Sequence, residues 1–173
     1  MKNALSLGTF DGVHIGHRAV LDMPQNYRRI AVTFEIPPKA VFSGKRELIM
    51  TAEDKISALK NIGIDEVLIL DFNAVKDMEP QEFLLDLWNK YKPQLISCGF
   101  NYRFGKNAKG DTSVLKQFCD ERGIEFCVSE PVKYDGDTVS SSSIREMLKN
   151  GEIEKVNKLL AQPFSFEGEV IKG

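Results

Sequence analysis

Two histidines near the amino terminus combine a residue type and a spacing that suit phosphate chemistry. His14 and His17 are the only two histidines among the 173 residues of the chain. Their spacing places both imidazole rings on one face of a helix. The unpaired N–H groups and the dipole at a helix start attract anions. If a helix begins here, the pair predicts a site for a phosphate group.

The residues around this pair fit a phosphate-binding turn between a strand and a helix. Gly8, Gly12 and Gly16 lack the Cβ atom that would keep phosphate oxygens away from the main chain. The apolar run at residues 4–7 predicts a strand before the turn, and a helix is expected over residues 15–23. The simpler alternative is that the histidines only cap this helix or lie on its surface.

A second candidate anion site lies in the run of serines at residues 140–143. Ser141 and Ser142 stand at the expected start of a helix over residues 141–150, where hydroxyl and backbone groups can both donate hydrogen bonds. Arg145 follows within about one helical turn and can donate two parallel hydrogen bonds to a phosphate. The alternative is a plain loop that only caps the helix.

Strand-like and helix-like segments alternate along the chain, which is typical of an α/β fold. Apolar strands separated by helices predict a parallel sheet with helices on both faces. Ligands bind such sheets beyond the carboxyl ends of the strands, where the first turn, Pro38 and the loop 99–105 can meet. The strands are predicted at residues 4–7, 29–34, 66–70, 94–98 and 124–128, and the helices at 15–23, 52–62, 80–91, 112–122, 141–150 and 152–161.

Four motifs, in order, resemble those of the FMN adenylyltransferase (FAD synthetase) module of bacterial bifunctional riboflavin kinase/FMN adenylyltransferases. They are Gly-Thr-Phe-Asp-Gly-Val-His-x-Gly-His at residues 8–17, Thr-Phe-Glu-Ile-Pro-Pro at 33–38, Gly-Phe-Asn-Tyr-Arg-Phe-Gly at 99–105 and Val-Ser-Ser-Ser-Ser-Ile-Arg at 139–145. The resemblance runs from about residue 5 to residue 173. Glu35 and Ile36 replace the Asp-Pro that is more usual in the family, and Pro38 stands near its usual His-Pro pair.

The resemblance implies a Rossmann-like fold of the HxGH nucleotidyltransferase type, and the reaction of ATP with FMN to give FAD and pyrophosphate. The implied catalytic residues are His14, His17 and Arg145. The implied ATP-binding residues are Gly8, Phe10, Asp11, Gly12, His14, Gly16, His17, Ser141, Ser142 and Arg145. The implied flavin-binding residues are Asn101, Phe104 and Pro38. We expect Mg²⁺ to be held by phosphate oxygens and water, and expect no metal site among the protein side chains.

The same resemblance suggests a division of the chain. Residues 1–162 are expected to form the FMN adenylyltransferase domain. Residues 163–173 are expected to be a linker or the start of a riboflavin kinase domain whose remainder is absent. The alternating apolar residues of 164–173 are typical of a strand, but no partner strand follows, so we expect this tail to be mobile or packed on the module's own surface. We therefore expect a C-terminal riboflavin kinase domain in the full-length protein and no riboflavin kinase activity in this chain.

Composition narrows the classes of partner. The net charge of −2 gives no reason to expect a nucleic acid or a membrane surface as partner. The family resemblance implies the small molecules ATP and FMN instead. The sequence has neither a run of about 18 apolar residues nor a signal-peptide pattern. Cys98, Cys119 and Cys127 lack the spacing of a metal or redox pair, so they predict reduced thiols in a cytoplasmic protein.

Two other functions stay open on the sequence alone. Another HxGH adenylyl- or cytidylyltransferase would use the same histidines on a different acceptor, such as pantetheine phosphate or nicotinamide mononucleotide. A non-catalytic flavin or nucleotide sensor could also use this fold. The loop 99–105 and the serine–arginine spacing favour the flavin branch, and the intact His14, His17 and Arg145 speak against a sensor.

Overall fold

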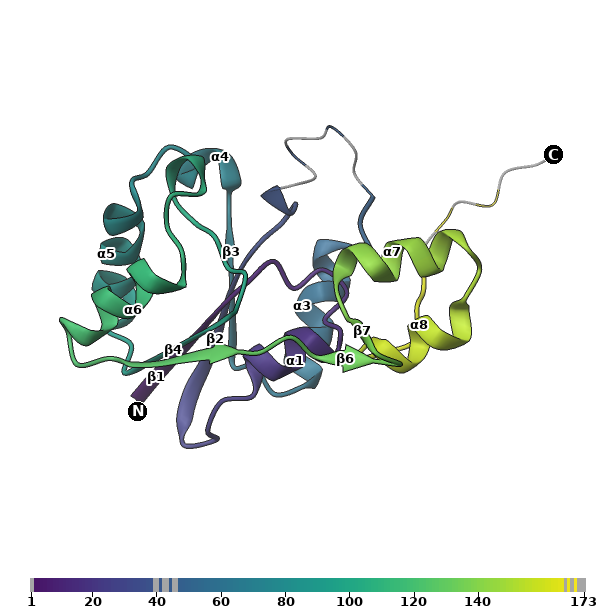
Figure 1. Cartoon of the computed structure of the whole chain (residues 1–173), viewed down its shortest axis with the longest axis horizontal. Coiled ribbons are helices and arrows are strands. Elements are labelled where there is room, and N and C mark those ends of the chain that lie inside the picture. The colour runs from purple at the N-terminus through teal and green to yellow at the C-terminus, as the bar shows by residue number, and fades with distance from the viewer. Residues whose placement is uncertain are drawn as a thin grey trace.

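A five-stranded sheet forms the centre of the computed structural model, which describes residues 2–38, 41, 44, 47–166, 168 and 170. Every pairing in this sheet is parallel, and the strand order is β3-β2-β1-β4-β5 (Figure 1). The strands are β1 (Lys2–Leu7), β2 (Tyr27–Phe34), β3 (Glu66–Leu70), β4 (Leu95–Gly99) and β5 (Glu125–Ser129). This order places the first strand of the chain in the middle of the sheet.

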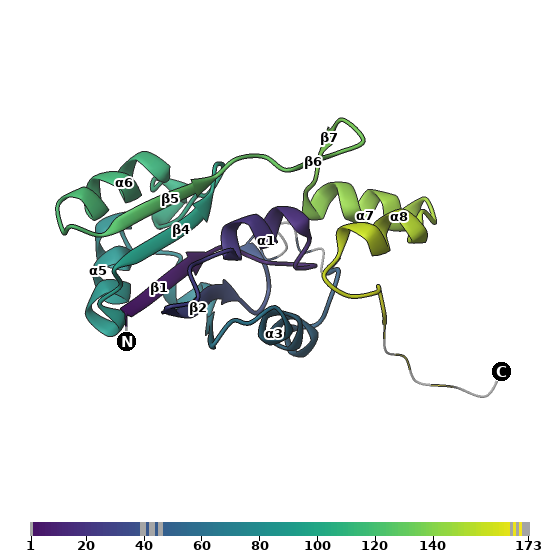
Figure 2. The same cartoon turned by 90° about the horizontal axis from the view of Figure 1, so that it is seen from below.

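Helices cover both faces of the sheet (Figure 2). The covering helices are α1 (Ile15–Leu21), α3 (Ala52–Asn61), α5 (Pro80–Tyr91) and α6 (Thr112–Asp120). Leu5 and Leu7 of β1 pack with α5 and α6, whereas Ala31 of β2 packs with α1 and α3 on the opposite face. Successive side chains of a strand point to opposite faces, so strands that are apolar throughout need a cover on each side. The expected α/β fold, with a parallel sheet and helices on both faces, is confirmed.

The registers of the sheet align the carboxyl ends of its central strands. Leu7 of β1 is paired with Val32 of β2 and with Cys98 of β4. The segments that leave these three strands therefore start at one edge of the sheet, where parallel sheets bind ligands. The first turn, the residues before Pro38 and the loop 99–105 begin there, as the sequence predicts.

A helical pair extends the fold beyond this edge. It consists of α7 (Ser141–Lys149) and α8 (Ile153–Leu159), and a short hairpin of β6 (Lys133–Tyr134) and β7 (Asp137–Thr138) precedes it (Figure 1). Ile144 of α7 and Val156 of α8 are fully buried in an apolar cluster that is separate from the two clusters on the sheet and that includes Ile49. The helical pair therefore has a small core of its own beside the carboxyl edge.

Within the described residues, the elements that the sequence does not predict are all short. They are α4 (Phe72–Val75), the hairpin of β6 and β7, and the 3-10 turn Lys106–Ala108. Segments of two to four residues carry no readable periodicity, so their patterns give no signal. The longer predicted elements all appear, with shifts of a few residues at their ends.

The described residues of the carboxyl-terminal tail form no strand, and the first part of the tail packs on the module's own surface. Residues 163–166 belong to no strand, and the Phe166 side chain is 85% exposed. The Phe164 N–H donates to Asn157 Oδ1 at 2.8 Å, and its side chain packs against the cluster of α7 and α8. Apolar alternation cannot form a strand without a partner for its backbone groups. Residues 167, 169 and 171–173 lie outside the described part of the chain.

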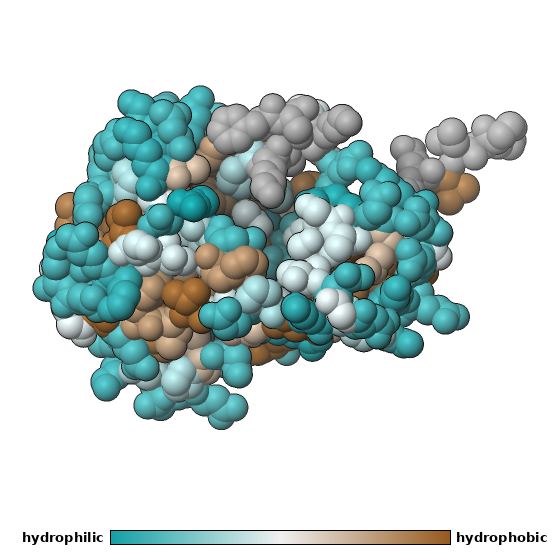
Figure 3. All heavy atoms as spheres, in the orientation of Figure 1, coloured by the Kyte–Doolittle hydropathy of each residue, from teal (hydrophilic) through white to brown (hydrophobic). Residues whose placement is uncertain are grey.

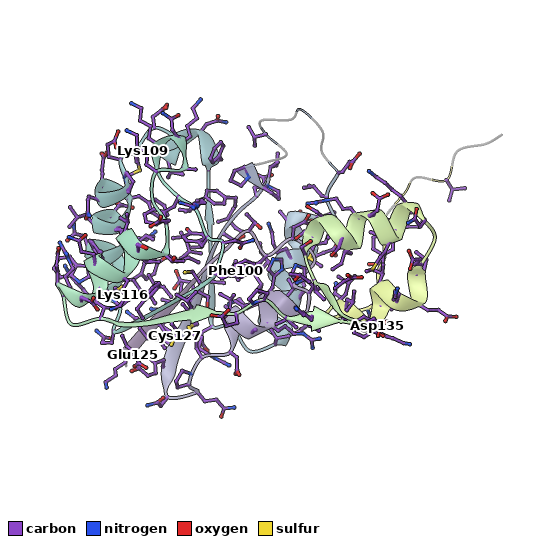
Figure 4. All side chains as sticks on the ribbon, viewed as in Figure 1. Phe100, Lys109, Lys116, Glu125, Cys127 and Asp135 are labelled. Carbon is purple, nitrogen blue, oxygen red and sulfur yellow. The ribbon has the colours of Figure 1, made fainter. Side chains whose placement is uncertain are left out.

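The surface in Figure 3 is mostly hydrophilic, and apolar colour gathers in the region of β5. Among the exposed large apolar side chains are Phe100, which follows β4, and Val128 of β5. Cys127 is exposed on the same strand, whereas Cys98 and Cys119 are buried free thiols (Figure 4). In the described residues, no helix has both the length and the apolar character that a membrane crossing requires.

Candidate active site

The two histidines form a stacked pair at the start of α1. Their ring centroids lie 3.6 Å apart and their planes are inclined by 19°. His14 is the residue before the helix, and its Nδ1 accepts a hydrogen bond of 3.2 Å from the backbone N–H of His17. A backbone N–H can only donate, so Nδ1 of His14 carries no proton and the neutral ring holds its proton on Nε2. The capping alternative is therefore present, but it uses only one nitrogen of His14.

Two imidazole nitrogens of this pair are buried without a hydrogen-bond partner among the described residues. They are Nε2 of His14 and Nδ1 of His17. His14 is 4% exposed, so water has little access to its ring. Buried polar atoms in native proteins nearly always have a partner, and an exception calls for an explanation such as a bound ligand. The orphaned nitrogens therefore favour a ligand at this position.

Burial keeps both histidines neutral near pH 7. It lowers the pKa of His14 from 6.5 to about 4, with a smaller contribution from the charge of Arg18. Burial, then His14 and then Lys55, lower the pKa of His17 well below its ordinary value. Two protonated rings stacked this closely would also repel each other. The pair can thus present neutral hydrogen-bonding groups rather than two cations.

The turn before the histidines has a strained backbone. Phe10 and Val13 adopt left-handed conformations with φ of 47° and 42°, which non-glycine residues rarely occupy. The fully buried ring of Phe10 meets the His17 ring edge-on, with 5.4 Å between centroids. The Phe10 ring therefore has no exposed face for a nucleotide to contact. Phe10 can affect nucleotide binding only through its backbone groups or through the position of the His17 ring.

Gly8 and Gly16 make room for side chains of the protein itself. A Cβ at Gly8 would lie 2.7 Å from the Phe10 ring, and a Cβ at Gly16 would lie 3.2 Å from the His14 ring. Gly12 has a positive φ of 92°. Gly8 and Gly16 therefore let the two rings pack into the turn, whereas a Cβ at Gly12 would meet the Ile49 and Leu160 side chains. The close approach of a phosphate to the three glycines stays a prediction.

Asp11 connects this turn to two other segments. Its Oδ1 accepts a 3.0 Å hydrogen bond from the Ile49 N–H, and its Oδ2 lies 3.0 Å from Nη2 of Arg145. Burial raises the pKa of Asp11, and the Ile49 N–H and the charges of Arg145 and Lys55 oppose that rise. The Ser141 hydroxyl donates to the Asp11 carbonyl at 2.9 Å. The predicted nucleotide residues Asp11, Ser141 and Arg145 therefore do come together.

Arg145 reaches the edge of the sheet from α7. Its Nε donates to the Glu47 carbonyl at 2.6 Å while Nη2 contacts Asp11. These contacts leave Nη1 of the guanidinium without an assigned partner among the described residues. Within the described part of the chain, the guanidinium is thus anchored through Nε and Nη2, and Nη1 has no partner.

The serine run divides into capping residues and residues near the site. The Ser140 hydroxyl accepts from the Ser143 N–H at 3.1 Å, and the Ser143 hydroxyl accepts from the Ser140 N–H at 2.9 Å. This capping box satisfies the outer backbone donors of α7. Ser142 is exposed in the first turn of the helix. Ser142 can therefore donate to a ligand without breaking the cap.

The predicted flavin residues start from the same edge, but they differ in exposure. Asn101 is exposed two residues after β4, and Pro38 is half-buried after β2. Phe104 is buried in the large core cluster, where its ring centroid lies 5.6 Å from Tyr102 and 5.7 Å from Phe83. No contact joins these three residues to the histidine pair in the described structure, and their flavin role stays a prediction.

One functional candidate, Lys55 of α3, is not among the site residues predicted from the sequence. Its side chain is fully buried, and its ammonium donates to the Thr9 and Phe34 carbonyls at the carboxyl edge. The spacing of Lys55, Ala58 and Leu59 is that of a buried helix face, and this is the signal that could have identified it.

Side chains that could ligate a metal ion do not gather at this edge among the described residues. Among the described residues, no three His, Cys, Asp or Glu side chains form a cluster that could hold a metal ion. Both Asp11 oxygens are engaged by protein donors. That Mg²⁺ is held by phosphate oxygens and water stays a prediction.

The comparisons with known proteins agree with the resemblance. The sequence profile of the family described as FAD synthetase matches residues 1–143. The bifunctional riboflavin kinase/FMN adenylyltransferases of Listeria monocytogenes and Bacillus subtilis are 28% and 31% identical over 100% and 99% of this chain. The chain spans only 58% and 57% of their lengths. A putative bifunctional riboflavin kinase/FMN adenylyltransferase of Geobacillus thermodenitrificans is 28% identical and is covered over 92% of its length.

A solved structure supports the fold. The crystal structure titled as a macrolide-efflux protein from Streptococcus pneumoniae matches 94% of this chain and 56% of its own chain. The TM-score is 0.83 and the identity is 26%. The two chains therefore share their fold over nearly the whole length of this chain.

Proposed function

Since this chain belongs to the FAD synthetase family, we propose that it transfers the AMP group of ATP to FMN, giving FAD and pyrophosphate. A phosphate oxygen of FMN attacks the α-phosphorus of ATP, a new P–O bond forms, and the bond to the pyrophosphate leaving group breaks. The observation that carries the proposal is the pair of buried, unpartnered nitrogens on His14 and His17. They lie at the carboxyl edge, where a parallel sheet binds its ligand.

The reaction needs little acid–base assistance from the protein. The attacking group is a phosphate monoester that is already ionised near neutral pH. The barrier comes from aligning two anions and from charge that develops on the α-phosphate and the departing pyrophosphate. His14 donates from Nε2 to a phosphate oxygen, and the neutral His17, stacked on it, presents its unpartnered Nδ1 to the same phosphate site. Neither ring has to gain or lose a proton.

Arg145 and Ser142 provide the second half of the phosphate site. The anchored guanidinium of Arg145 presents Nη1 to the β- and γ-phosphates, and the exposed first turn of α7 supplies the Ser142 hydroxyl and backbone donors. A magnesium ion, when bound, neutralises charge on the phosphate oxygens. The flavin would lie over the loop 99–105, with Asn101 meeting its hydrogen-bonding edge.

A panel of acceptors tests the proposal. We expect pyrophosphate release from ATP with FMN, FAD as the product, and little release with pantetheine phosphate or nicotinamide mononucleotide. Equal or greater release with a non-flavin acceptor would assign the chain to another adenylyltransferase reaction. Binding of ATP or FMN without any release would support a sensor instead.

Two further expectations concern the cell compartment of the enzyme and the reaction that supplies FMN. We infer that the enzyme works in the cytoplasm, where the free Cys98, Cys119 and Cys127 stay reduced. The relatives' names include a riboflavin kinase activity. We expect the 173-residue chain to make no FMN from riboflavin and magnesium–ATP, and chromatography of the mixture checks this.

A further inference from the structure

A buried positive charge lies at the proposed site and has no part in the reaction as described above. Lys55 of α3 is 2% exposed. Lysine is almost never buried this completely unless it is paired with an opposite charge. Burial lowers the pKa of Lys55, and the charges of Asp11 and Glu35 oppose that fall. Its ammonium forms hydrogen bonds to two backbone carbonyls but no salt bridge with a described carboxylate. Burying such a charge is unfavourable, so its presence calls for a reason.

The hydrogen bonds of Lys55 join the ends of two central strands. Its Nζ lies 2.5 Å from the Phe34 carbonyl at the end of β2 and 3.3 Å from the Thr9 carbonyl just after β1. The Thr9 carbonyl also accepts from the Thr33 hydroxyl at 2.8 Å. Two side chains from different elements therefore hold the peptide that connects Thr9 to Phe10.

That peptide leads directly into the strained part of the turn. Phe10 adopts its left-handed conformation immediately after Thr9, and its ring meets His17. Such a conformation persists only when the surrounding contacts over-determine it. A continuous path of contacts therefore runs from Lys55 through Thr9 and Phe10 to His17.

The charge of Lys55 also suits the ligand class. A triphosphate is strongly anionic, and a fixed cation behind the site stabilises it without reorganisation when it binds. Lys55 acts electrostatically on Asp11 and on His17, so its field reaches both the turn and the histidine pair.

We propose that Lys55 is a positioning residue: its ammonium holds the turn before His14 and His17 in the geometry that phosphate transfer requires, and its charge favours a polyphosphate at this edge. The inference rests on the proposed function for its reaction, although its effect on the turn does not. Lys55 contacts neither the phosphates nor the flavin, and it acts through Thr9 and Phe10.

Four variants of the full chain test the proposal. Lys55→Met removes the charge and keeps a long side chain, and Lys55→Arg keeps the charge and donors. Lys60→Met is the matched control, because Lys60 lies on the same helix and is exposed. Thr33→Val removes the second donor to the Thr9 carbonyl with almost no change of shape.

The kinetic expectation separates positioning from folding. We expect Lys55→Met to lower kcat about tenfold to a hundredfold, since small misplacements of reacting groups have effects of this size. The melting temperature should fall by only a few degrees or rise, because a buried charge is removed. Lys55→Arg should restore much of kcat, Lys60→Met should match the wild type, and Thr33→Val should lower kcat less than Lys55→Met.

A second readout does not depend on catalysis. The two histidines give two imidazole signals in a proton NMR titration. Removing the Lys55 charge should raise the pKa of His17, whereas Lys60→Met should leave it unchanged. Inorganic tripolyphosphate should bind Lys55→Met more weakly than the wild type.

The outcomes distinguish this inference from the proposed function. If the wild type releases no pyrophosphate with any acceptor, the proposed reaction fails, and the titration and tripolyphosphate binding still decide the role of Lys55. Wild-type kcat and an unchanged His17 titration in Lys55→Met would overturn the inference. So would an activity loss that follows a lower melting temperature and that Lys55→Arg does not restore. If Lys55→Met does not fold, wild-type kcat in Thr33→Val overturns it.

Discussion

Arg145 and Asp11 form a largely buried ion pair, although 134 positions separate them in the sequence. The Asp11 side chain is 3% exposed and that of Arg145 is 23% exposed, so solvent screens the pair only weakly. The same guanidinium donates to the Glu47 carbonyl. The pair thus fixes α7, the first turn and the segment around residue 47 relative to one another.

Arg145→Lys should impair the use of ATP more than that of FMN. A lysine cannot hold Asp11 and Glu47 and also present a planar fork to phosphate. We expect KM for ATP to rise by roughly tenfold or more, which corresponds to about 1.4 kcal/mol. KM for FMN should change little, as steady-state kinetics with each substrate varied in turn will show.

Lys149→Met is the control for that substitution. Lys149 lies one turn further along α7 and pairs with Glu47, but both side chains are about half exposed. Such surface pairs contribute little, so its kinetics should match the wild type. A change confined to KM for FMN in Arg145→Lys would place Arg145 away from the ATP phosphates.

His14→Asn should separate helix capping from phosphate binding. Asparagine is a good residue before a helix and can accept the His17 N–H as Nδ1 of His14 does. It has no group that reproduces the Nε2 donor. We expect the melting temperature to stay within a few degrees and kcat to fall by about 10²–10³, the usual effect of losing one such donor.

His14→Ala, which loses both functions, provides the comparison. It should show the same loss of kcat together with a lower stability, because the helix also loses its cap. Near-normal kcat in His14→Asn would mean that His14 acts only as a cap.

The stability of the fold should fall as the pH is lowered from 6.5 toward 4. The unfolded chain protonates His14 below its ordinary pKa of 6.5, whereas the folded pKa is lowered to about 4. The unfolded state therefore binds more protons in this window, and the stabilisation present above pH 6.5 is lost as the pH falls. His17 acts in the same direction. The slope for each histidine is at most about 1.4 kcal/mol per pH unit.

Urea unfolding at several pH values checks this expectation. Carboxylates also titrate in the lower part of this pH window. The informative quantity is therefore the difference in the free energy of unfolding between the wild type and His14→Asn. That difference should narrow as the pH falls. Parallel pH curves for the two proteins would contradict the lowered pKa of His14.

Ser6 and Ser97 should affect stability as a coupled pair. Both buried hydroxyls donate to the Val20 carbonyl near the end of α1, at 3.0 and 2.9 Å. Either single change to alanine leaves one donor, but the double change leaves a buried carbonyl without a side-chain partner, at a cost of about 1–3 kcal/mol. We expect the free energy of unfolding to fall by more in the double variant than the sum of its decreases in the two single variants.

A double-mutant cycle in urea measures this coupling, and Ser57→Ala, on the exposed face of α3, is the control. Because α1 carries His17, the double variant should also lower kcat. Strict additivity of the two single changes would show that the hydroxyls do not share the Val20 carbonyl in solution.

Local patterns predict the sheet and its helices well. The strand Glu66–Leu70 and the helix Pro80–Tyr91 have the predicted bounds, because an apolar run and a Pro-initiated amphipathic repeat are each decided locally. The histidine pair is equally local, since its stacking follows from a spacing of three residues at a helix start.

The remaining parts of the site depend on contacts that no local pattern contains. The pairing of Asp11 with Arg145 joins residues far apart in the chain, and the burial of Phe104 is decided by Phe83 on another element. The burial of Lys55 is hard to predict for a different reason, because a charged residue normally lies at an exposed position. Here Lys55 shares the buried face of α3 with Ala58 and Leu59.

The central place of β1 has a consequence for how the chain folds during synthesis. β1 pairs with β2 on one side, but its other neighbour, β4, ends only at Gly99. At roughly 5–20 residues per second, a nascent chain therefore carries an apolar strand with one bare edge for several seconds after β2 has emerged. Such an edge is a template for pairing with other chains. We expect ribosome-bound fragments that end before β4 to need chaperones, whereas fragments that include β4 should already resist proteolysis.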